Sequence, residues 1–146
     1  MLRLKKHNER GSTLVEFAIG VTVFATVMFA VLEFSRALWV HNALADAARR
    51  GARYAVLHAA NDEAQVKNVV VFGNSSGTGN PMLNDLSTEN VEVTYTGFGL
   101  NEGTVTVSIT DYQFQFVIPI VGTTITMPSY STTLTAESAG LLPNNV

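Results

Sequence analysis

The sequence predicts an α+β fold in which a long N-terminal helix, transmembrane in its first half, packs on a small antiparallel β-sheet. Three observations predict it: an apolar segment near the N-terminus, a proline-free helical pattern beyond it, and alternating apolar and polar residues towards the C-terminus. The expected organisation is a basic leader at 1–11, a long helix at 12–60 with a transmembrane segment at 13–32, and an exported α+β domain at 61–146.

The apolar segment 13–32 reads TLVEFAIGVTVFATVMFAVL and contains one charged residue in twenty. As a helix it would be about 30 Å long, enough to cross the hydrocarbon core of a bilayer. A buried soluble helix is the alternative, but the rest of the chain is too small to cover a helix that is apolar on every side. The positive-inside rule predicts a single pass with a cytoplasmic N-terminus, because the leader is basic at Arg3, Lys5, Lys6 and Arg10.

The charge distribution argues against nucleic acid as a partner. The formal net charge is −3, and Lys67 is the only lysine or arginine after Tyr54. Binding to a phosphate backbone depends on clustered lysine and arginine. The outer part of the chain is acidic instead, at Asp62, Glu63, Asp85, Glu89, Glu92, Glu102, Asp111 and Glu137.

The residue types that catalysis and metal binding need are missing or badly spaced. The chain has no cysteine, which excludes a disulfide framework, a thiolate metal site and a cysteine nucleophile. His7, His41 and His58 lack the spacing and the glutamate of a helical zinc site. The outer domain has no histidine that could act as base for a serine or threonine nucleophile. We therefore expect no enzyme activity, no cofactor and no metal.

The helical pattern continues past the apolar segment to about Ala60, because the sequence there is rich in alanine and free of proline. Gly51 interrupts it at a cost of roughly 1 kcal/mol relative to alanine. It indicates either a close helix contact or a local bend. Charged pairs at helical spacing are expected to be solvated and to add about 0.3 kcal/mol each: Glu33 with Arg36, and Asp46 with Arg49 and Arg50.

The outer domain is expected to begin with a short helix, capped by Asn61 or Asp62 and ending at Phe72, followed by a loop at 73–81. Alternation then predicts an antiparallel meander of three to five strands, the last pair within 124–135, with a bulge at Asp111. The apolar face of this sheet needs cover, and the outer part of the long helix is the nearest candidate. The inward residues are Val91, Val93 and Tyr95, then Val105, Val107 and Ile109, then Tyr112, Phe114, Phe116 and Ile118.

The most informative stretch is KKHNERGSTLVEFAIG, in which the leader ends at Gly11 and Glu16 is the fifth residue after that glycine, with Phe17 beside it. No small-x-small cleavage site bounds the apolar segment, so the segment is expected to survive processing. The arrangement resembles the processing site of type IV prepilins, and the Glu-Phe pair is similar to the tight-adherence (Tad) branch. Together with AARRGARYA at 47–55, it resembles the TadE-like family of minor pilins and pseudopilins over about the first sixty residues.

The resemblance implies a pilin-like fold and cleavage between Gly11 and Ser12 by a prepilin peptidase on the cytoplasmic side. It implies that Glu16, with Phe17, serves assembly by pairing with the freed terminal amine of a neighbour. The implied partners are the peptidase, other major and minor pilins, the inner-membrane assembly platform of the secretion system, and membrane lipid. The implied location is the bacterial inner membrane, single-pass with a periplasmic domain, and after assembly an adhesive pilus on the cell surface.

Two features of the apolar segment have alternative interpretations. A lone ionised group in a bilayer costs about 3 kcal/mol or more, which favours a paired Glu16. Glu16 could instead reach the interface and favour the positive end of the helix dipole. Small residues recur at every fourth position, at Ala18, Thr22, Thr26 and Ala30. They indicate either a seam for helix packing or a chance pattern in a segment rich in alanine and threonine.

The alternative function is an uncut, signal-anchored envelope protein whose small sheet domain binds a ligand or a partner. The first residue of the mature protein separates the two hypotheses. Ser12 indicates the pilin, and Met1 indicates the anchor.

Overall fold

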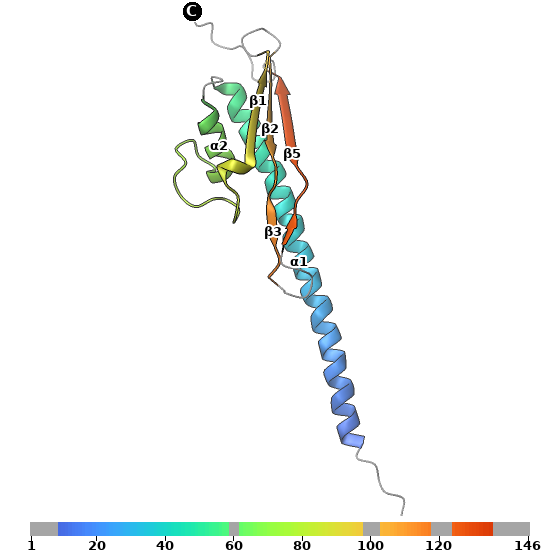
Figure 1. Ribbon diagram of the computed structural model, residues 1–146. Helices are drawn as coiled ribbons and strands as arrows, with labels where there is room; N and C mark the ends of the chain where they lie inside the picture. Colours follow the sequence, from blue (N-terminus) through green and yellow to red (C-terminus); the bar gives the residue numbers. More distant parts are fainter. Residues whose placement is uncertain (1–8, 59–61, 98–102, 118–123, 136–146) are drawn as a thin grey trace, which may run out of the picture. The chain divides into compact units, whose positions relative to one another are not determined.

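The computed structural model describes residues 9–58, 62–97, 103–117 and 124–135 of the chain (Figure 1). The chain divides into an N-terminal unit, residues 1–36, and a C-terminal unit, residues 37–146. Helix α1 (Glu9–Leu57) contributes to both units. It begins and ends three residues earlier than the helix expected at 12–60.

In the N-terminal unit, α1 exposes nearly all of its side chains. Its most apolar 18-residue window has a mean hydropathy of 2.2 and contains no buried residue, so α1 is long and apolar enough to span a membrane. The α+β fold class with a long apolar N-terminal helix is therefore confirmed.

The C-terminal unit contains a three-stranded antiparallel sheet in the order β1 (Val91–Thr96), β2 (Thr104–Ile109) and β5 (Tyr130–Thr135). The short strands β3 (Gln113–Gln115) and β4 (Thr124–Thr126) pair with each other in a separate antiparallel hairpin. Antiparallel pairing is as predicted, but the simple meander is wrong, because β5 rather than β3 pairs with β2.

The break between β2 and β3 lies at Asp111, which has a left-handed backbone with φ of 56°. The change of phase at this residue therefore ends one sheet and starts another, and it is not a bulge within a continuous strand. The end of β2 is held by Asn90, whose carbonyl accepts from the Thr110 N–H at 2.9 Å and whose side-chain amide donates to the Thr110 carbonyl at 3.1 Å. Ile118 lies outside the described residues.

Helix α2 (Glu63–Phe72) confirms the predicted short helix. Asp62 occupies the N-cap position, but its side chain makes no capping hydrogen bond. Gly73 ends the helix with φ of 76°, and its N–H donates to the Val69 carbonyl at 3.1 Å. A short 3-10 helix, η2 (Thr88–Asn90), leads into β1.

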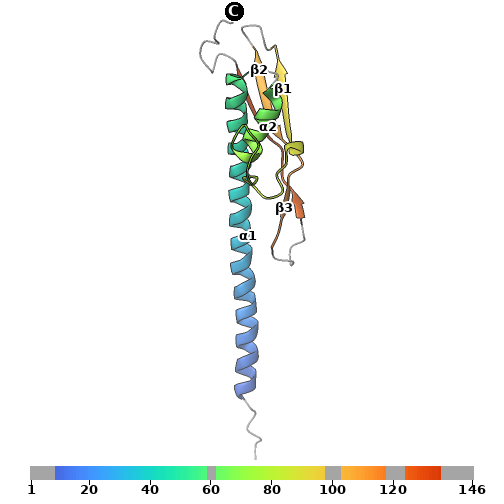
Figure 2. The same ribbon diagram turned by 90° about the vertical axis from the view of Figure 1, so that its left-hand side faces the viewer.

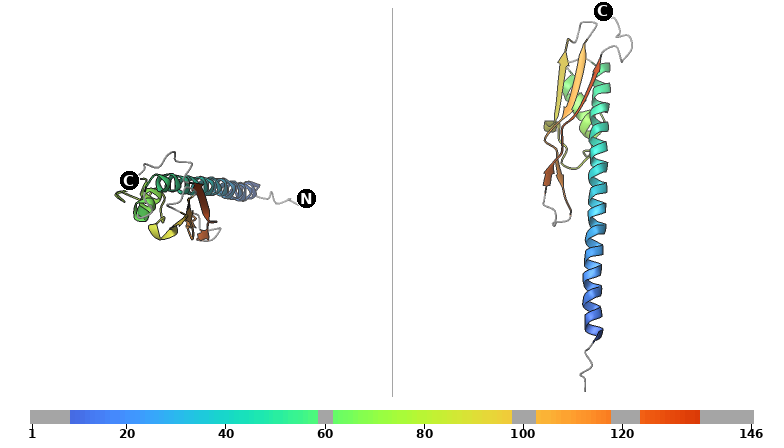
Figure 3. Two further views of the ribbon diagram at one scale, coloured as in Figure 1. Left: turned by 90° about the horizontal axis from the view of Figure 1, so that it is seen from above. Right: turned by 90° about the vertical axis from the view of Figure 1, so that its right-hand side faces the viewer.

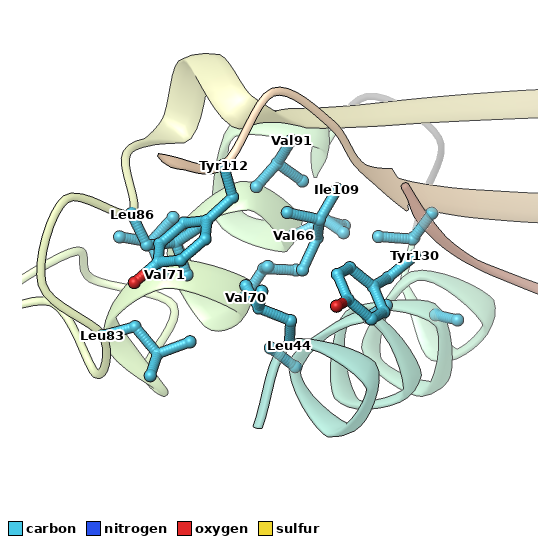
Figure 4. Close-up of a cluster of buried hydrophobic side chains, with 14 of the residues drawn as sticks. Leu44, Val66, Val70, Val71, Leu83, Leu86, Val91, Ile109, Tyr112 and Tyr130 are labelled. Carbon is cyan, nitrogen blue, oxygen red and sulfur yellow. The ribbon is translucent and has the colours of Figure 1, made fainter. Parts of the chain in front are cut away.

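Within the C-terminal unit, α1 covers one face of the three-stranded sheet and α2 lies beside it (Figures 2 and 3). Alternate residues of each strand point inwards, as the sequence predicts, while the outer face carries mainly threonine and serine. Figure 4 shows how the side chains of α1, α2 and the strands meet in one core. Its largest fully buried members are Phe114, Leu44, Leu86, Ile109, Val66, Val70, Val71, Val105 and Val107.

Gly51 marks a close contact of α1 with α2 and β2, which decides between the two interpretations above. A Cβ atom at this position would overlap Cγ2 of Val70 and lie 3.2 Å from Cγ1 of Val107. The small residues around it are also buried, at Ala47, Ala48, Ala52 and Ala55. The AARRGARYA segment therefore brings the helix backbone close to the rest of the core.

The charged pairs on α1 differ in their environment. Asp46 and Arg49 form the expected exposed pair at 3.0 Å. Arg50 instead donates to the Met82 sulfur at 3.1 Å. Glu33 pairs with Arg36 at 2.9 Å; the Arg36 side chain is 40% exposed, but Glu33 is buried, so the prediction of a solvated pair is wrong for the carboxylate.

Two tyrosines with raised pKa values should make the C-terminal unit less stable at alkaline pH. Burial raises the pKa of Tyr130, whose hydroxyl lies 2.8 Å from Nδ1 of His41. Burial also raises the pKa of Tyr95, and the carboxylates of Glu63 and Asp62 raise it further. Above pH 10.0, the ordinary tyrosine value, the unfolded chain therefore loses phenol protons before the folded chain does. The free energy of unfolding should fall as the pH rises through that range.

We expect Tyr130→Phe to weaken this alkaline loss. At neutral pH the free energy of unfolding of the variant should be about 1 kcal/mol lower, because the hydrogen bond to His41 is lost. The measurement is the urea midpoint of the full chain in detergent at neutral and at alkaline pH. An equal decrease in the wild type and the variant would rule out Tyr130 as a source of the pH dependence.

Candidate processing and assembly site

Gly11 is a helical residue near the start of α1, and nothing in the described structure requires a glycine there. A Cβ atom at Gly11 would meet no atom within 4 Å, and its φ is not positive. A glycine at such a position destabilises a helix by about 1 kcal/mol relative to alanine. Gly20, also in α1, is equally open and so provides a matched comparison.

Ser12 and Glu16 are four residues apart on α1, so they lie one turn apart on the same face. Both are exposed, as is Phe17, which has 69% of its surface accessible. No described residue forms a salt bridge with Glu16. The carboxylate thus sits one turn from the predicted new N-terminus without a cationic partner among the described residues.

The small-residue stripe is exposed along its whole length, and its threonine hydroxyls bond within the helix. Thr22 Oγ1 donates to the Ala18 carbonyl and Thr26 Oγ1 to the Thr22 carbonyl, both at 2.8 Å. Ala18 and Thr22 also line a shallow hollow of about 260 Å³. With the hydroxyls already bonded, the stripe would contact a second helix through close packing. Its role as a seam stays a prediction.

The C-terminal unit contains a groove that the sequence does not predict. It has a volume of about 340 Å³ and lies between α1 and the loop that follows α2. Its walls combine apolar side chains with Asp46 and Arg50, and Trp39 lines it while remaining 61% exposed. The lone tryptophan of the chain was the available signal, but only the fold brings Met82, Leu83 and Leu86 beside it.

Residues 11–53 match the family model described as TadE-like protein. The match begins at Gly11 and ends within the AARRGARYA segment, so the resemblance stated from the sequence is confirmed over these residues. The match covers less than a third of the chain, and it shows similarity to the TadE-like family over these residues. Helix α1, which contains them, is long and apolar enough to span a membrane. No curated protein and no solved structure matches the chain.

Proposed function

We propose that this TadE-like protein is a minor pilin or pseudopilin of a Tad type IV pilus, trimmed after Gly11 and assembled through α1. The observation that supports the proposal most is the N-terminal part of α1, which exposes its apolar side chains and one carboxylate, Glu16, that no described residue neutralises. Such a surface is unfavourable in water and unfavourable in lipid at the carboxylate. Side-by-side packing with other pilin helices would satisfy both parts.

In this proposal the protein acts by packing and not by catalysis. A prepilin peptidase cuts between Gly11 and Ser12, and the freed amine of one subunit pairs with Glu16 of its neighbour. Before assembly the chain crosses the inner membrane once, with its C-terminal unit in the periplasm. Its partners are the peptidase, other major and minor pilins, and the assembly platform in the membrane. The openness at Gly11 supports a role for this glycine outside the fold.

Gly11→Ala tests the cut, and Gly20→Ala is its matched control. Both variants add a methyl group in open space on the same helix, so both should have about the same effect on helix stability, a gain of about 1 kcal/mol or less. We expect Gly11→Ala to accumulate as full-length chain and Gly20→Ala to mature normally. The measurement is the intact mass of the protein from membranes. Normal maturation of Gly11→Ala would contradict the proposal.

The groove beside Trp39 supports the ligand-binding role that the alternative, an uncut and signal-anchored protein, gives to the C-terminal unit, because its volume of about 340 Å³ is in the range of small-molecule sites. N-terminal sequencing of the protein purified from membranes separates the two functions. A mature N-terminus at Ser12 supports the pilin, while a chain that starts at Met1 in a strain with active peptidase supports the anchored binding protein.

A further inference from the structure

The exposed apolar side chains of the C-terminal unit are concentrated in two segments. Four of the six exposed large apolar side chains described in this unit belong to the first residues of its α1 segment or to the β3–β4 hairpin, namely Leu38, Trp39, Val117 and Ile125. They are 48%, 61%, 74% and 44% exposed. Single exposed apolar residues are ordinary on protein surfaces, but a group of them indicates an interaction surface.

Strand β2 shows that the two segments lie at the same end of the unit. Gly51 of α1 faces Val107 of β2. His41 of α1 contacts Tyr130, which is paired with Ile109 of β2. The C-terminal end of β2, at Ile109, therefore lies closer to the N-terminal part of the α1 segment, at His41, than Val107 does. The chain continues in that direction into the hairpin, which Figures 1 and 2 show at the end of the unit where α1 enters it.

The two segments that form this end contain no charged residue, although Trp39 also lines the groove with Asp46 and Arg50. Residues 37–40 and 112–135 contain no aspartate, glutamate, lysine, arginine or histidine. On the polar face of the hairpin, Gln113 Nε2 donates to Thr126 Oγ1 at 2.9 Å, so these side chains satisfy each other. Uncharged polar groups that are already hydrogen-bonded cost much less to bring near lipid than charged groups do.

We infer that this end, defined by Leu38, Trp39, Val117 and Ile125, rests in the interfacial layer of the bilayer that α1 crosses. The inference depends on the proposed function, since it needs α1 in a membrane. Leu38 follows the apolar segment 13–32 by six residues in the sequence, and the Glu33–Arg36 ion pair lies between them. Tryptophan favours this layer, where its ring is partly apolar and its N–H stays near water. Because residues 37–40 and 112–135 contain no lysine or arginine, the inference does not require anionic lipid.

The test uses the full-length chain in vesicles and takes advantage of its lack of cysteine. Single cysteines are introduced by Val117→Cys at the hairpin, Thr94→Cys on the outer face of β1, and Thr22→Cys in the apolar segment, and each is labelled with a nitroxide. Relaxation by oxygen, which concentrates in lipid, is compared with relaxation by a water-soluble nickel complex. We expect the oxygen-to-nickel ratio at residue 117 to exceed that at residue 94, and the ratio at residue 22 to be the highest.

Trp39 gives an independent readout because it is the only tryptophan. Its emission should be quenched by lipids brominated near the headgroup, equally in uncharged and in anionic vesicles. The inference would be overturned if the nickel complex reached residue 117 as readily as residue 94. If residue 22 still showed high oxygen access in that experiment, the proposed function would be unaffected. Nickel access at residue 22 would overturn the proposed function as well. Low nickel access at residue 117 that rises when the protein is diluted with lipid would also overturn the inference. It would indicate that a second copy of the chain, and not lipid, covers this surface.

Discussion

Replacing Glu16 with glutamine should yield a protein that is cut and inserted in the membrane but absent from fibres. Glutamine keeps the size of the side chain and removes the charge that would attract a neighbour's terminal amine. A hydrogen bond to a charged group contributes about 1.5–3 kcal/mol, which is on the order of a ten- to hundred-fold change in an association constant. The measurement is the amount of the variant in sheared fibres relative to membranes.

Glu92→Gln is the control for this change. Glu92 is exposed on the outer face of β1, so its neutralisation removes the same charge from the C-terminal unit. We expect this variant to enter fibres like the wild type. If Glu16→Gln also enters fibres at the wild-type level, the carboxylate does not pair with a neighbour, and the interpretation that it reaches the membrane interface is the better one.

Gly51→Ala should destabilise the C-terminal unit although alanine is the better helix former. The new Cβ would overlap Val70, a β-branched residue of α2 with one strongly preferred rotamer, and would crowd Val107 from the other side. Overpacking of this kind costs about 1–3 kcal/mol, against a gain of about 1 kcal/mol in helix propensity. The expected net loss of up to about 2 kcal/mol lowers the melting temperature by up to about 10 °C. Thermal unfolding in detergent, followed by Trp39 fluorescence, measures it.

A double variant tests whether overlap with Val70 causes this loss of stability. Val70→Ala alone opens a cavity at a cost of roughly 2 kcal/mol. In Gly51→Ala/Val70→Ala the atom that the new methyl group would overlap is gone, so the double variant should lose less stability than the sum of the single variants. Gly20→Ala, in open space, should cause no loss. Additive losses would show that the contact between Gly51 and Val70 does not limit the packing.

The matched segment 11–53 combines two physically different tasks. Its beginning presents Gly11, Ser12 and Glu16 on a helix surface that is exposed in the single chain. Its end buries small residues around Gly51 so that α2 and the sheet can approach the same helix. Substitutions at the beginning should therefore change maturation and assembly, whereas substitutions at the end should change the stability of the C-terminal unit.

The sequence by itself determined the features that depend on local pattern. The apolar segment after the leader predicts a helix able to span a membrane, and the alternation of apolar residues predicts which side chains of β1 and β2 face inwards. Gly11, Glu16 and the AARRGARYA segment predict the resemblance to the TadE-like family without knowledge of the fold, because the match at 11–53 depends on residue identity along one helix.

Only the tertiary structure decided the features that depend on contacts between distant residues. Strand order is one, because the left-handed Asp111 separates β3 from β2 and β5 returns to pair with β2. Gly51 is another, since its close contact requires Val70 and Val107 to meet the same helix turn. The apolar end that includes Trp39 and Val117 is the third. These residues are far apart in sequence, and a periodic pattern describes one element at a time, so it cannot tell which elements share an end.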